Sequence, residues 1–450
     1  MRPGLSRMLT AALVVTAALA GTASVRAAES HGETDIFLTG ATIHPVSGEA
    51  IPRGTLHLSG ASIAAVGSGL DIPAGARRID VTGKHIYPVF IHAGSALGLT
   101  EVSAVASTVD AAENGDLNPE LRVEVAFHGD SRLLPVARAG GVLYAHVAPR
   151  GGLLSGTSAV FRLEGWNWQD MVVRAPVGLH LRYPRVLAPT RSFGRRPPKT
   201  QSEVDEERKI QEEILEKLFE DARAYLRARD SGTSPEPPRD QKLEALLPVL
   251  TGELPLFVHA EERKQIAAAL EFVEKSEIPR TVLVSGADAA EFAGRLARDG
   301  VPVVLTGVLA LPRRSWQAYD TAFTAAARLR EAGVKIAIAD GGSTFEAAHS
   351  RNLPFQAAMA VAHGLPHRQA LAAITLDAAE ILGVADRLGS IEAGKEASFL
   401  ITDGDALEIT TKIEAVWHAG AEVDRSSDRQ WLLYQRYRHR PRASPAGASP

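Results

Sequence analysis

The chain has 450 residues, of which 45% are hydrophobic and 23% are charged. These values are typical of a soluble globular protein, and the length allows one large domain beside a smaller one. The net charge of −4 gives no reason to expect nucleic acid or an anionic membrane as a partner. The chain has no cysteine, which excludes disulfides, cysteine nucleophiles and thiolate metal sites.

The first 27 residues have the pattern of a secretory signal peptide. Arg2 and Arg7 flank the start of an apolar run over residues 8–20, and small residues lead to a cleavage site after Ala27. The apolar run is short for a transmembrane span, and an uncleaved anchor is the alternative. We therefore expect an exported protein, periplasmic or secreted, that keeps no membrane attachment once residues 1–27 are removed.

Two segments far apart in the sequence alternate apolar and polar residues in short runs broken by Gly and Pro. They are residues 31–88 and 388–425. An alternation with a period of two residues predicts β-strands, because successive side chains of a strand point to opposite faces.

Between these segments, residues 89–387 alternate strand patterns with amphipathic helix patterns, which predicts a parallel sheet. The eight predicted strands are Ile86–His92, Arg122–Phe127, Gly141–Val147, Val177–Leu181, Leu254–His259, Thr281–Ser285, Val301–Leu305 and Lys335–Asp340. Helices are predicted after several of them, as at Glu262–Lys275 and Ala287–Arg298. Eight such units predict a (β/α)8 barrel, whose active sites lie at the C-terminal ends of the strands.

Residues 189–245 interrupt this rhythm. They hold a highly charged helix over Glu203–Arg229, flanked by two Pro-rich linkers. We expect a solvated helical insertion over the barrel, with a helix for a partner protein as the alternative. Residues 426–450 form a basic and aromatic tail, for which we expect a packed terminal helix with a disordered end.

Three segments resemble the amidohydrolase superfamily. Residues 87–99 (YPVFIHAGSALGL) resemble its first barrel strand, but Gly94 and Ala96 stand at the positions of a metal-binding HxH motif. Residues 389–401 (GSIEAGKEASFLI) resemble its closing strands, and residues 350–384 match the pattern that follows its last barrel strand. The chain is similar to an imidazolonepropionase-like branch that also lacks the HxH motif. The resemblance implies a composite β-sandwich made from the two terminal β segments.

The resemblance also implies one divalent metal, most simply Zn²⁺, that activates a water molecule. His259 would be a ligand at the end of strand 5, and Asp340 at the end of strand 8 would be a ligand and the proton shuttle. A catalytic zinc site usually needs three protein ligands. His92 is therefore a candidate third ligand, and His146 and His180 are the alternatives. A hydrogen-bonded histidine without metal is the other interpretation of each.

The strand pattern limits these candidates. His92 and Gly94 are expected on one face of their strand, with His92 about 7 Å deeper. Strand 6 ends at Ser285, a poor zinc ligand. Asp340 falls one residue earlier than in the family pattern, and a bulge at the following glycine pair would restore its direction.

Two loops are further candidates. Residues 151–158 (GGLLSGTS) could present backbone N–H groups to an anion or carbonyl, or could form a structural turn. His349, Arg351 and Asn352 follow strand 8 and are candidate substrate-binding residues, with Arg351 suited to a carboxylate. An ordinary solvated loop is the alternative.

The sequence contains no nucleophile elbow, dinucleotide-binding glycine motif or HExxH motif. Two functions stay open. The first is an exported amidohydrolase-like hydrolase acting on a non-peptide or cyclic amide C–N bond of a small molecule. The second is a catalytically inactive protein of the same fold, without metal, that binds a small molecule or a partner protein. Self-association into a homo-oligomer is compatible with either.

Overall fold

A computed structural model describes residues 35–189, 197–231, 237–426 and 428–441. The predicted signal peptide and the last nine residues lie outside these ranges. Within the described part, every helix is too short or too polar to cross a membrane.

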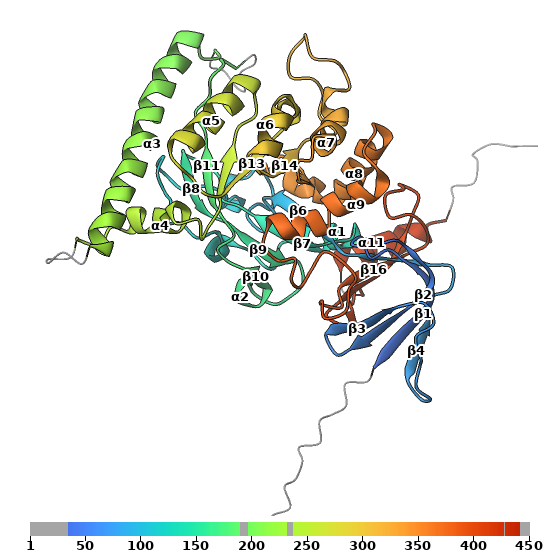
Figure 1. The fold of residues 1–450 in the computed structure, drawn as a ribbon. Coiled ribbons are helices and arrows are strands. Elements are labelled where there is room, and N and C mark those ends of the chain that lie inside the picture. Colours follow the sequence, from blue (N-terminus) through green and yellow to red (C-terminus); the bar gives the residue numbers. More distant parts are fainter. Residues whose placement is uncertain (1–34, 190–196, 232–236, 427, 442–450) are drawn as a thin grey trace, which may run out of the picture.

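Strands from both ends of the chain share one sheet. Its members are β1 (Ile36–Ile43), β2 (Ile51–Ser59), β3 (Ser62–Gly67), β4 (Arg77–Asp80), β5 (His85–Pro88), β16 (Phe399–Thr402), β17 (Ile413–His418) and β18 (Ala421–Glu422). The order is β18-β17-β16-β5-β1-β2-β3, and β4 also pairs with β1. The antiparallel β16–β5 pair, with Phe399 opposite Pro88, joins the two termini. This β domain protrudes from one end of the molecule (Figure 1).

The β domain has a core of its own. The alternation noted in the sequence puts every second side chain on one face, where it is removed from water. The buried residues include Leu38, Ile43, Leu56, Phe399 and Trp417, and the rings of Phe399 and Trp417 are stacked with centroids 5.3 Å apart. The two facing layers of a sandwich stay a prediction.

The larger domain is a barrel-like arrangement of mostly parallel strands. They are β6 (Phe90–Ser95), β7 (Val142–Val147), β11 (Leu179–Arg182), β12 (Leu256–His259), β13 (Thr281–Ser285), β14 (Val303–Thr306) and β15 (Ile336–Ala339). Parallel ladders join β6 to β7 and run from β11 through to β15. Strands β15 and β6 lie side by side, but no hydrogen-bonded ladder joins them in the described residues.

The predicted strand Arg122–Phe127 is wrong. Its central residues form a short 3-10 helix, η2 (Val123–Ala126). Two short strands, β8 (Leu154–Thr157) and β9 (Ala159–Arg162), take the place of the predicted second barrel strand. Strand β8 runs antiparallel to β11, and β9 runs antiparallel to β7. Strand β10 (Val172–Arg174) pairs antiparallel with β9 and forms the edge of this sheet. Half of the Gly-rich segment over residues 151–158 is therefore strand.

Gly156 shows why that strand needs glycine. Its φ is +108°, and a Cβ there would lie 2.7 Å from the carbonyl oxygen of Leu121. Both the positive φ and the close approach exclude a side chain. The structural interpretation of the Gly-rich segment fits these contacts better than an anion-binding loop.

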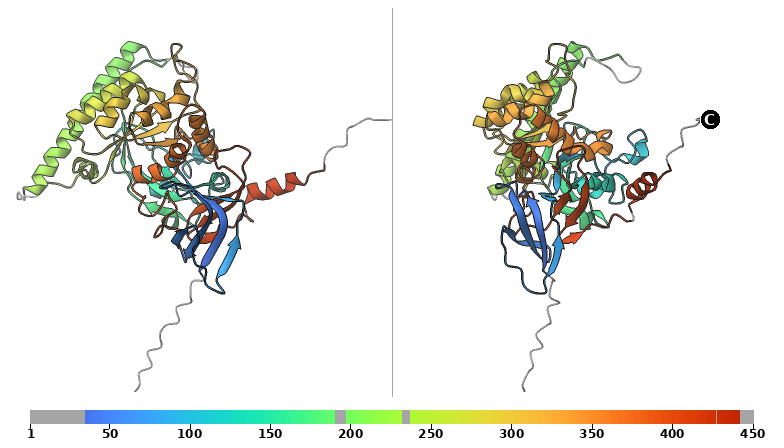
Figure 2. Two further views of the ribbon diagram at one scale, coloured as in Figure 1. Left: turned by 45° about the vertical axis from the view of Figure 1, so that its right-hand side comes forward. Right: turned by 90° about the vertical axis from the view of Figure 1, so that its right-hand side faces the viewer.

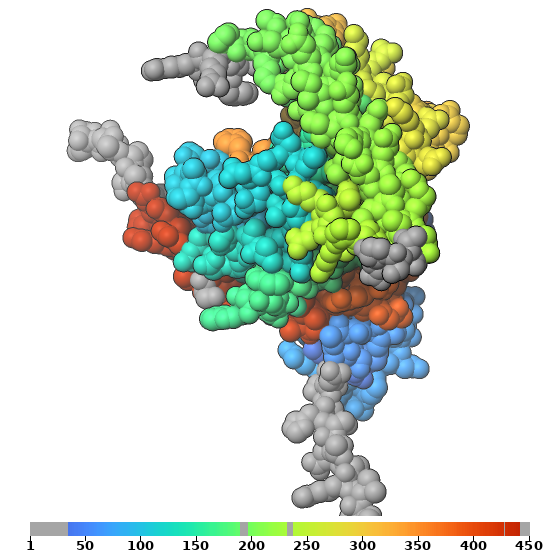
Figure 3. Space-filling view, turned by 90° about the vertical axis from the view of Figure 1, so that its left-hand side faces the viewer, coloured from blue at the N-terminus to red at the C-terminus, as the bar shows by residue number. Residues whose placement is uncertain are grey.

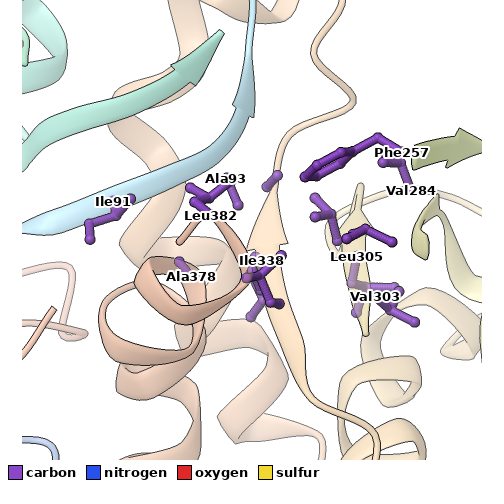
Figure 4. Close-up of a cluster of buried hydrophobic side chains, with 14 of the residues drawn as sticks. Ile91, Ala93, Phe257, Val284, Val303, Leu305, Ile338, Ala378 and Leu382 are labelled. Carbon is purple, nitrogen blue, oxygen red and sulfur yellow. The ribbon is translucent and has the colours of Figure 1, made fainter. Parts of the chain in front are cut away.

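Helices cover the outside of the barrel (Figures 1 and 2). They are α1 (Leu133–Ala139), α5 (Arg263–Lys275), α6 (Ala293–Arg298), α7 (Thr321–Glu331), α8 (Leu353–Ala362), α9 (His367–Ala373) and α10 (Leu376–Ile381). Short turns are η1 (Ala106–Thr108), α2 (Trp168–Met171), η3 (Ala287–Phe292) and η4 (Glu346–Asn352). Figure 4 shows part of the core, where Ile91 of β6 and Ile338 of β15 lie on either side of Ala378 of α10.

The charged segment forms α3 (Gln201–Asp230), followed by α4 (Gln241–Leu250). Thr200 and Glu203 begin α3 with a reciprocal capping box. One face of α3 is buried, and Phe219 packs edge-on against Phe272 of α5. Figure 3 shows α3 (light green) running along this side of the molecule next to α5 (yellow). The helix is thus part of the layer that covers the barrel, not only a solvated insertion. The last helix, α11 (Arg429–Arg438), has no buried residue.

Candidate functional site

A small cavity lies at the C-terminal ends of the barrel strands, where the barrel pattern predicts a site. Its volume is about 30 Å³. Strands β6, β7, β11, β12, β13 and β14, and the turns after β7 and β15, supply its wall. The polar side chains of the wall include Ser95, His146, Arg150, Arg182, His259 and Asp340. Phe257 lies beneath them, because its ring is 4.9 Å from that of His180 and 5.1 Å from that of His146.

A bulge in β6 changes which side chains face this cavity. His92 pairs with Ala145 of β7, but Ser95 pairs with Val147, so β6 has one extra residue between the two pairs. Such a bulge breaks the alternation of faces along a strand. A Cβ at Gly94 would lie 3.6 Å from the Cβ of Ala339 and 3.8 Å from Cγ1 of Val304, and the expectation that His92 and Gly94 share a face stays a prediction. Gly94 and Ser95 both line the cavity, and Ala96 is buried outside the cavity wall.

His92 and Asp340 meet in the interior. Nε2 of His92 lies 3.0 Å from Oδ2 of Asp340, and both side chains are at least 94% buried. The Gly94 N–H donates to Nδ1 of His92 at 3.3 Å, so a neutral ring carries its proton on Nε2. The two atoms are at ion-pair distance, but Nε2 lacks a well-directed hydrogen bond.

Asp340 is further held by groups around it. The Gly342 N–H donates to Oδ1 at 2.8 Å, and the Ser350 hydroxyl donates to Oδ2 at 3.2 Å. Ser350 in turn lies 3.0 Å from the hydroxyl of Ser95. The displaced Asp340 does reach the cavity wall, with both carboxylate oxygens already engaged.

The rings of His180 and His259 are bonded to each other. Nδ1 of His180 lies 2.8 Å from Nε2 of His259, so one ring donates and the other accepts. Burial holds the pKa of both rings well below the usual value, and the positive charge of Arg182 adds to the shift at each. Both rings are therefore neutral at pH 7. Nε2 of His180 is buried without a hydrogen-bond partner in the described part of the chain.

His146 is fully hydrogen-bonded. Its Nδ1 donates to the carbonyl of Ala93 at 2.8 Å, and its Nε2 then accepts from the hydroxyl of Ser158 at 2.7 Å. Burial lowers its pKa to about 4. Both ring nitrogens serve the fold, so His146 has no lone pair free for a metal.

Two arginines line the same cavity, and our sequence analysis missed them. Arg150 follows β7 and donates from Nη1 to the carbonyl of Gly341 at 3.1 Å. Arg182 ends β11, in register with His259. Burial and the charge of Arg150 lower the pKa of Arg182 to about 10, while Glu261 opposes the shift. The signal was present in the sequence, because Arg182 follows His180 by two residues and so shares its face.

Comparison with known proteins places the chain in a family. The profile of the Amidohydrolase family matches residues 175–424, which is more than half of the chain. The chain belongs to the amidohydrolase family. An amidohydrolase from Thermotoga maritima MSB8 aligns with 86% of this chain and 99% of its own, at 25% identity and a TM-score of 0.74. A prolidase complexed with N-methylphosphonate-L-proline shares the fold alone, at 15% identity and a TM-score of 0.51. These likenesses support a TIM-barrel-like α/β fold.

Curated relatives match over shorter stretches. An imidazolonepropionase from Symbiobacterium thermophilum is 31% identical over 169 residues, which are 37% of this chain and 36% of the relative. One from Bacteroides fragilis is 30% identical over 156 residues, which are 34% of each chain. The matches therefore span about a third of the length of these relatives.

Amidohydrolases typically bind a divalent metal, and the residues of this cavity fit one poorly. No group of three or more His, Asp or Glu side chains able to hold a metal occurs within the described ranges. The predicted ligands His92 and Asp340 face each other, whereas His259 is bonded to His180. The guanidinium of Arg182 beside His259 also repels a cation. The structure therefore does not bring the predicted ligand set together as a metal site.

The predicted substrate-binding residues lie outside the cavity. His349, Arg351 and Asn352 belong to η4, where His349 and Arg351 are exposed. Backbone and Cβ atoms of Arg351 pack close to Gly140, before the start of β7. The residue of this segment that reaches the site is Ser350, which is 1% exposed. A substrate contact through the other three stays a prediction that this geometry does not favour.

Proposed function

We propose that this amidohydrolase-family chain binds a small molecule at the mouth of its barrel without the metal-dependent hydrolytic centre of its relatives. The observation that carries the proposal is the 2.8 Å hydrogen bond between His180 and His259. This bond places a proton between the two nitrogens, where a metal ligand needs a free lone pair. The adjacent Arg182 puts a fixed positive charge where a metal ion would add a second one.

Hydrolysis of a C–N bond is the second candidate. Family membership and the partial matches to imidazolonepropionases favour it. The position of Asp340 at the C-terminal end of β15 is also compatible with a proton shuttle. The reaction would require the ring of His259 to turn away from His180, and a further ligand to join it.

Metal analysis and a hydrolysis assay separate the two candidates. The mature chain would be purified without chelators, its Zn, Fe, Mn, Ni and Co content measured, and N-acyl amino acids and cyclic amides offered with and without added metal. We expect less than about a tenth of an equivalent of metal and no turnover, because a catalytic site keeps its ion bound. One equivalent of metal, with turnover that His259→Ala abolishes, would establish the hydrolase instead.

Export is part of the same proposal. The pattern of residues 1–27 supports cleavage after Ala27 and a periplasmic or secreted mature chain. Amino-terminal sequencing of the protein recovered from the periplasmic fraction should begin at Ala28. A chain recovered only from the cytoplasm with Met1 intact would contradict export. Light scattering of the same sample would show whether the mature chain forms a homo-oligomer.

A further inference from the structure

The guanidinium groups of Arg150 and Arg182 are the cationic groups of the cavity wall, and they have few partners in the described residues. A guanidinium carries five N–H donors and no acceptor. Arg150 uses one donor on the carbonyl of Gly341, and the side chain of Arg182 makes no hydrogen bond or ion pair with the described residues. Both are only partly exposed, so water satisfies them incompletely. Unused donors at a concave wall favour an acceptor that the protein does not supply.

The acidic groups nearby are mostly occupied elsewhere. Glu261 pairs with Arg313 at 2.7 Å, and Glu346 accepts from the backbone and hydroxyl of Ser343. Asp340 is the one carboxylate on the cavity wall, and its oxygens are engaged by Gly342, Ser350 and His92. Burial lowers the pKa of His146, His180 and His259, so these three histidines of the wall are neutral. The residues that line the cavity carry two positive charges and one negative charge, while Glu346 and Glu261, which do not line it, also stabilise the charge of Arg150. Two guanidinium groups on one wall still favour an anion with a single charge.

The size of the cavity narrows the choice of anion. A volume of about 30 Å³ holds roughly two water-sized centres, since one water needs about 10–15 Å³ on this measure. Two oxygen atoms of a carboxylate need a similar space. A tetrahedral phosphate has more oxygens than the cavity can take without movement of its wall. The rest of a ligand would have to extend out of this small cavity.

We propose that Arg150 and Arg182 bind the carboxylate of a small carboxylic acid, whose negative charge takes the place that a metal and its bound water have in related enzymes. This inference rests on the proposed function, since a bound metal would compete for the same space. Planar guanidinium groups suit a planar carboxylate, because two parallel N–H···O bonds can form with each fork. The protein would hold the carboxylic acid by its carboxylate group. Arg150 and Arg182, and not Arg351, would then be the residues that bind a ligand carboxylate.

Acetate binding to the mature chain tests the proposal. Saturation-transfer NMR in a low-chloride buffer would follow acetate, with neutral acetamide as the shape-matched control and with propionate and inorganic phosphate as competitors. We expect acetate to bind, propionate to displace it, and acetamide and phosphate to have little effect. Equal binding of acetamide, or displacement by phosphate but not by propionate, would overturn the assignment to a carboxylate.

Variants assign the binding to these side chains. Arg182→Gln and Arg150→Gln should each weaken acetate binding by about tenfold or more, because charge-assisted bonds are lost. Arg182→Lys keeps the charge without the fork and should fall in between. The matched control is Arg328→Gln, whose partner is Glu291 outside the cavity, and it should bind as the wild type does. Circular dichroism and thermal unfolding would confirm that each variant is folded. Wild-type affinity in folded Arg182→Gln would sink the proposal.

The two proposals fail in different ways. If the protein holds one equivalent of metal through His259 and still binds acetate through Arg182, the metal-free function is wrong and the carboxylate site stands. If the protein is free of metal and acetate does not bind, the carboxylate site is wrong and the metal-free function stands.

Discussion

His180 and His259 come from neighbouring parallel strands, and their rings are joined by a 2.8 Å hydrogen bond at the mouth of the barrel. His259 is the one histidine that the sequence identifies as an inherited ligand. The bond to His180 gives it a different task, because the bond engages Nε2 of His259 and Nδ1 of His180, and neither of these two nitrogens offers a free lone pair to a metal while the bond holds. Arg182 lies in register with His259 and places a fixed positive charge where a related enzyme would bind a metal cation.

The coupling between these two rings can be measured directly. His180→Ala and His259→Ala should each lower the free energy of unfolding by about 1–3 kcal/mol, since each leaves a buried partner unsatisfied. The double variant should cost less than the sum, with a coupling of at least about 0.5 kcal/mol. Urea unfolding gives all three values. Strict additivity would mean that the bond contributes nothing to stability.

Asp340 has a structural role that does not depend on metal. Asp340→Ala leaves His92, Ser350 and the Gly342 N–H without their shared acceptor, so we expect a loss of about 2–3 kcal/mol in unfolding free energy. The melting temperature of the wild type should not change when a chelator is added. A chelator effect as large as that of Asp340→Ala would instead identify Asp340 as a metal ligand.

Burial of neutral His146 makes stability depend on pH. Its pKa is about 4 when folded and about 6.5 when unfolded, so between these values the unfolded chain binds the extra proton. Stability therefore falls as the pH drops through this window, by about 2 kcal/mol between pH 7 and pH 5 from this residue. His146→Gln should reduce the pH dependence of unfolding by that amount. Exposed His349→Gln is the control and should keep the wild-type slope, and equal slopes in both variants would refute the assignment.

Helix α3 should be essential for the barrel layer. Phe219 is fully buried against α5, so Phe219→Ala should destabilise the chain by about 3–5 kcal/mol. Ile214 on the same helix is 37% exposed, and Ile214→Ala is the matched control with an expected loss of under about 1 kcal/mol. Thermal unfolding of both variants compares them. If Phe219→Ala is as mild as the control, α3 is a solvated insertion after all.

The sequence predicts the family and most of the strand order, because strand periodicity and the motifs near the chain ends are local signals. Seven of the eight predicted strands overlap observed ones. The exception, Arg122–Phe127 (RVEVAF), alternates apolar and polar residues as a strand does, yet its centre forms a 3-10 helix. The opposite error occurs at Gly156, where a glycine-rich pattern typical of a loop belongs to β8. In both segments tertiary contacts, and not the local sequence pattern, determine the secondary structure.

The site was harder to predict than the fold. The resemblance to the amidohydrolase superfamily identifies Asp340 and His259 as site residues, and both lie on the cavity wall. The sequence predicts His92 and Asp340 as ligands of one metal, but their direct contact and the bulge after His92 depend on tertiary pairing that no local pattern shows. Arg150 was missed because its side chain reaches the cavity from a turn whose course the sequence does not specify.

Titration of Zn²⁺ into chelator-treated mature protein tests the central claim most directly. The heat of binding would be compared between the wild type and His259→Ala, because surface histidines bind zinc equally in both. We predict that the two isotherms coincide, with no site tighter than about 10 µM that depends on His259. A tight one-to-one site in the wild type that disappears in His259→Ala would contradict the account and restore a metal centre to this barrel.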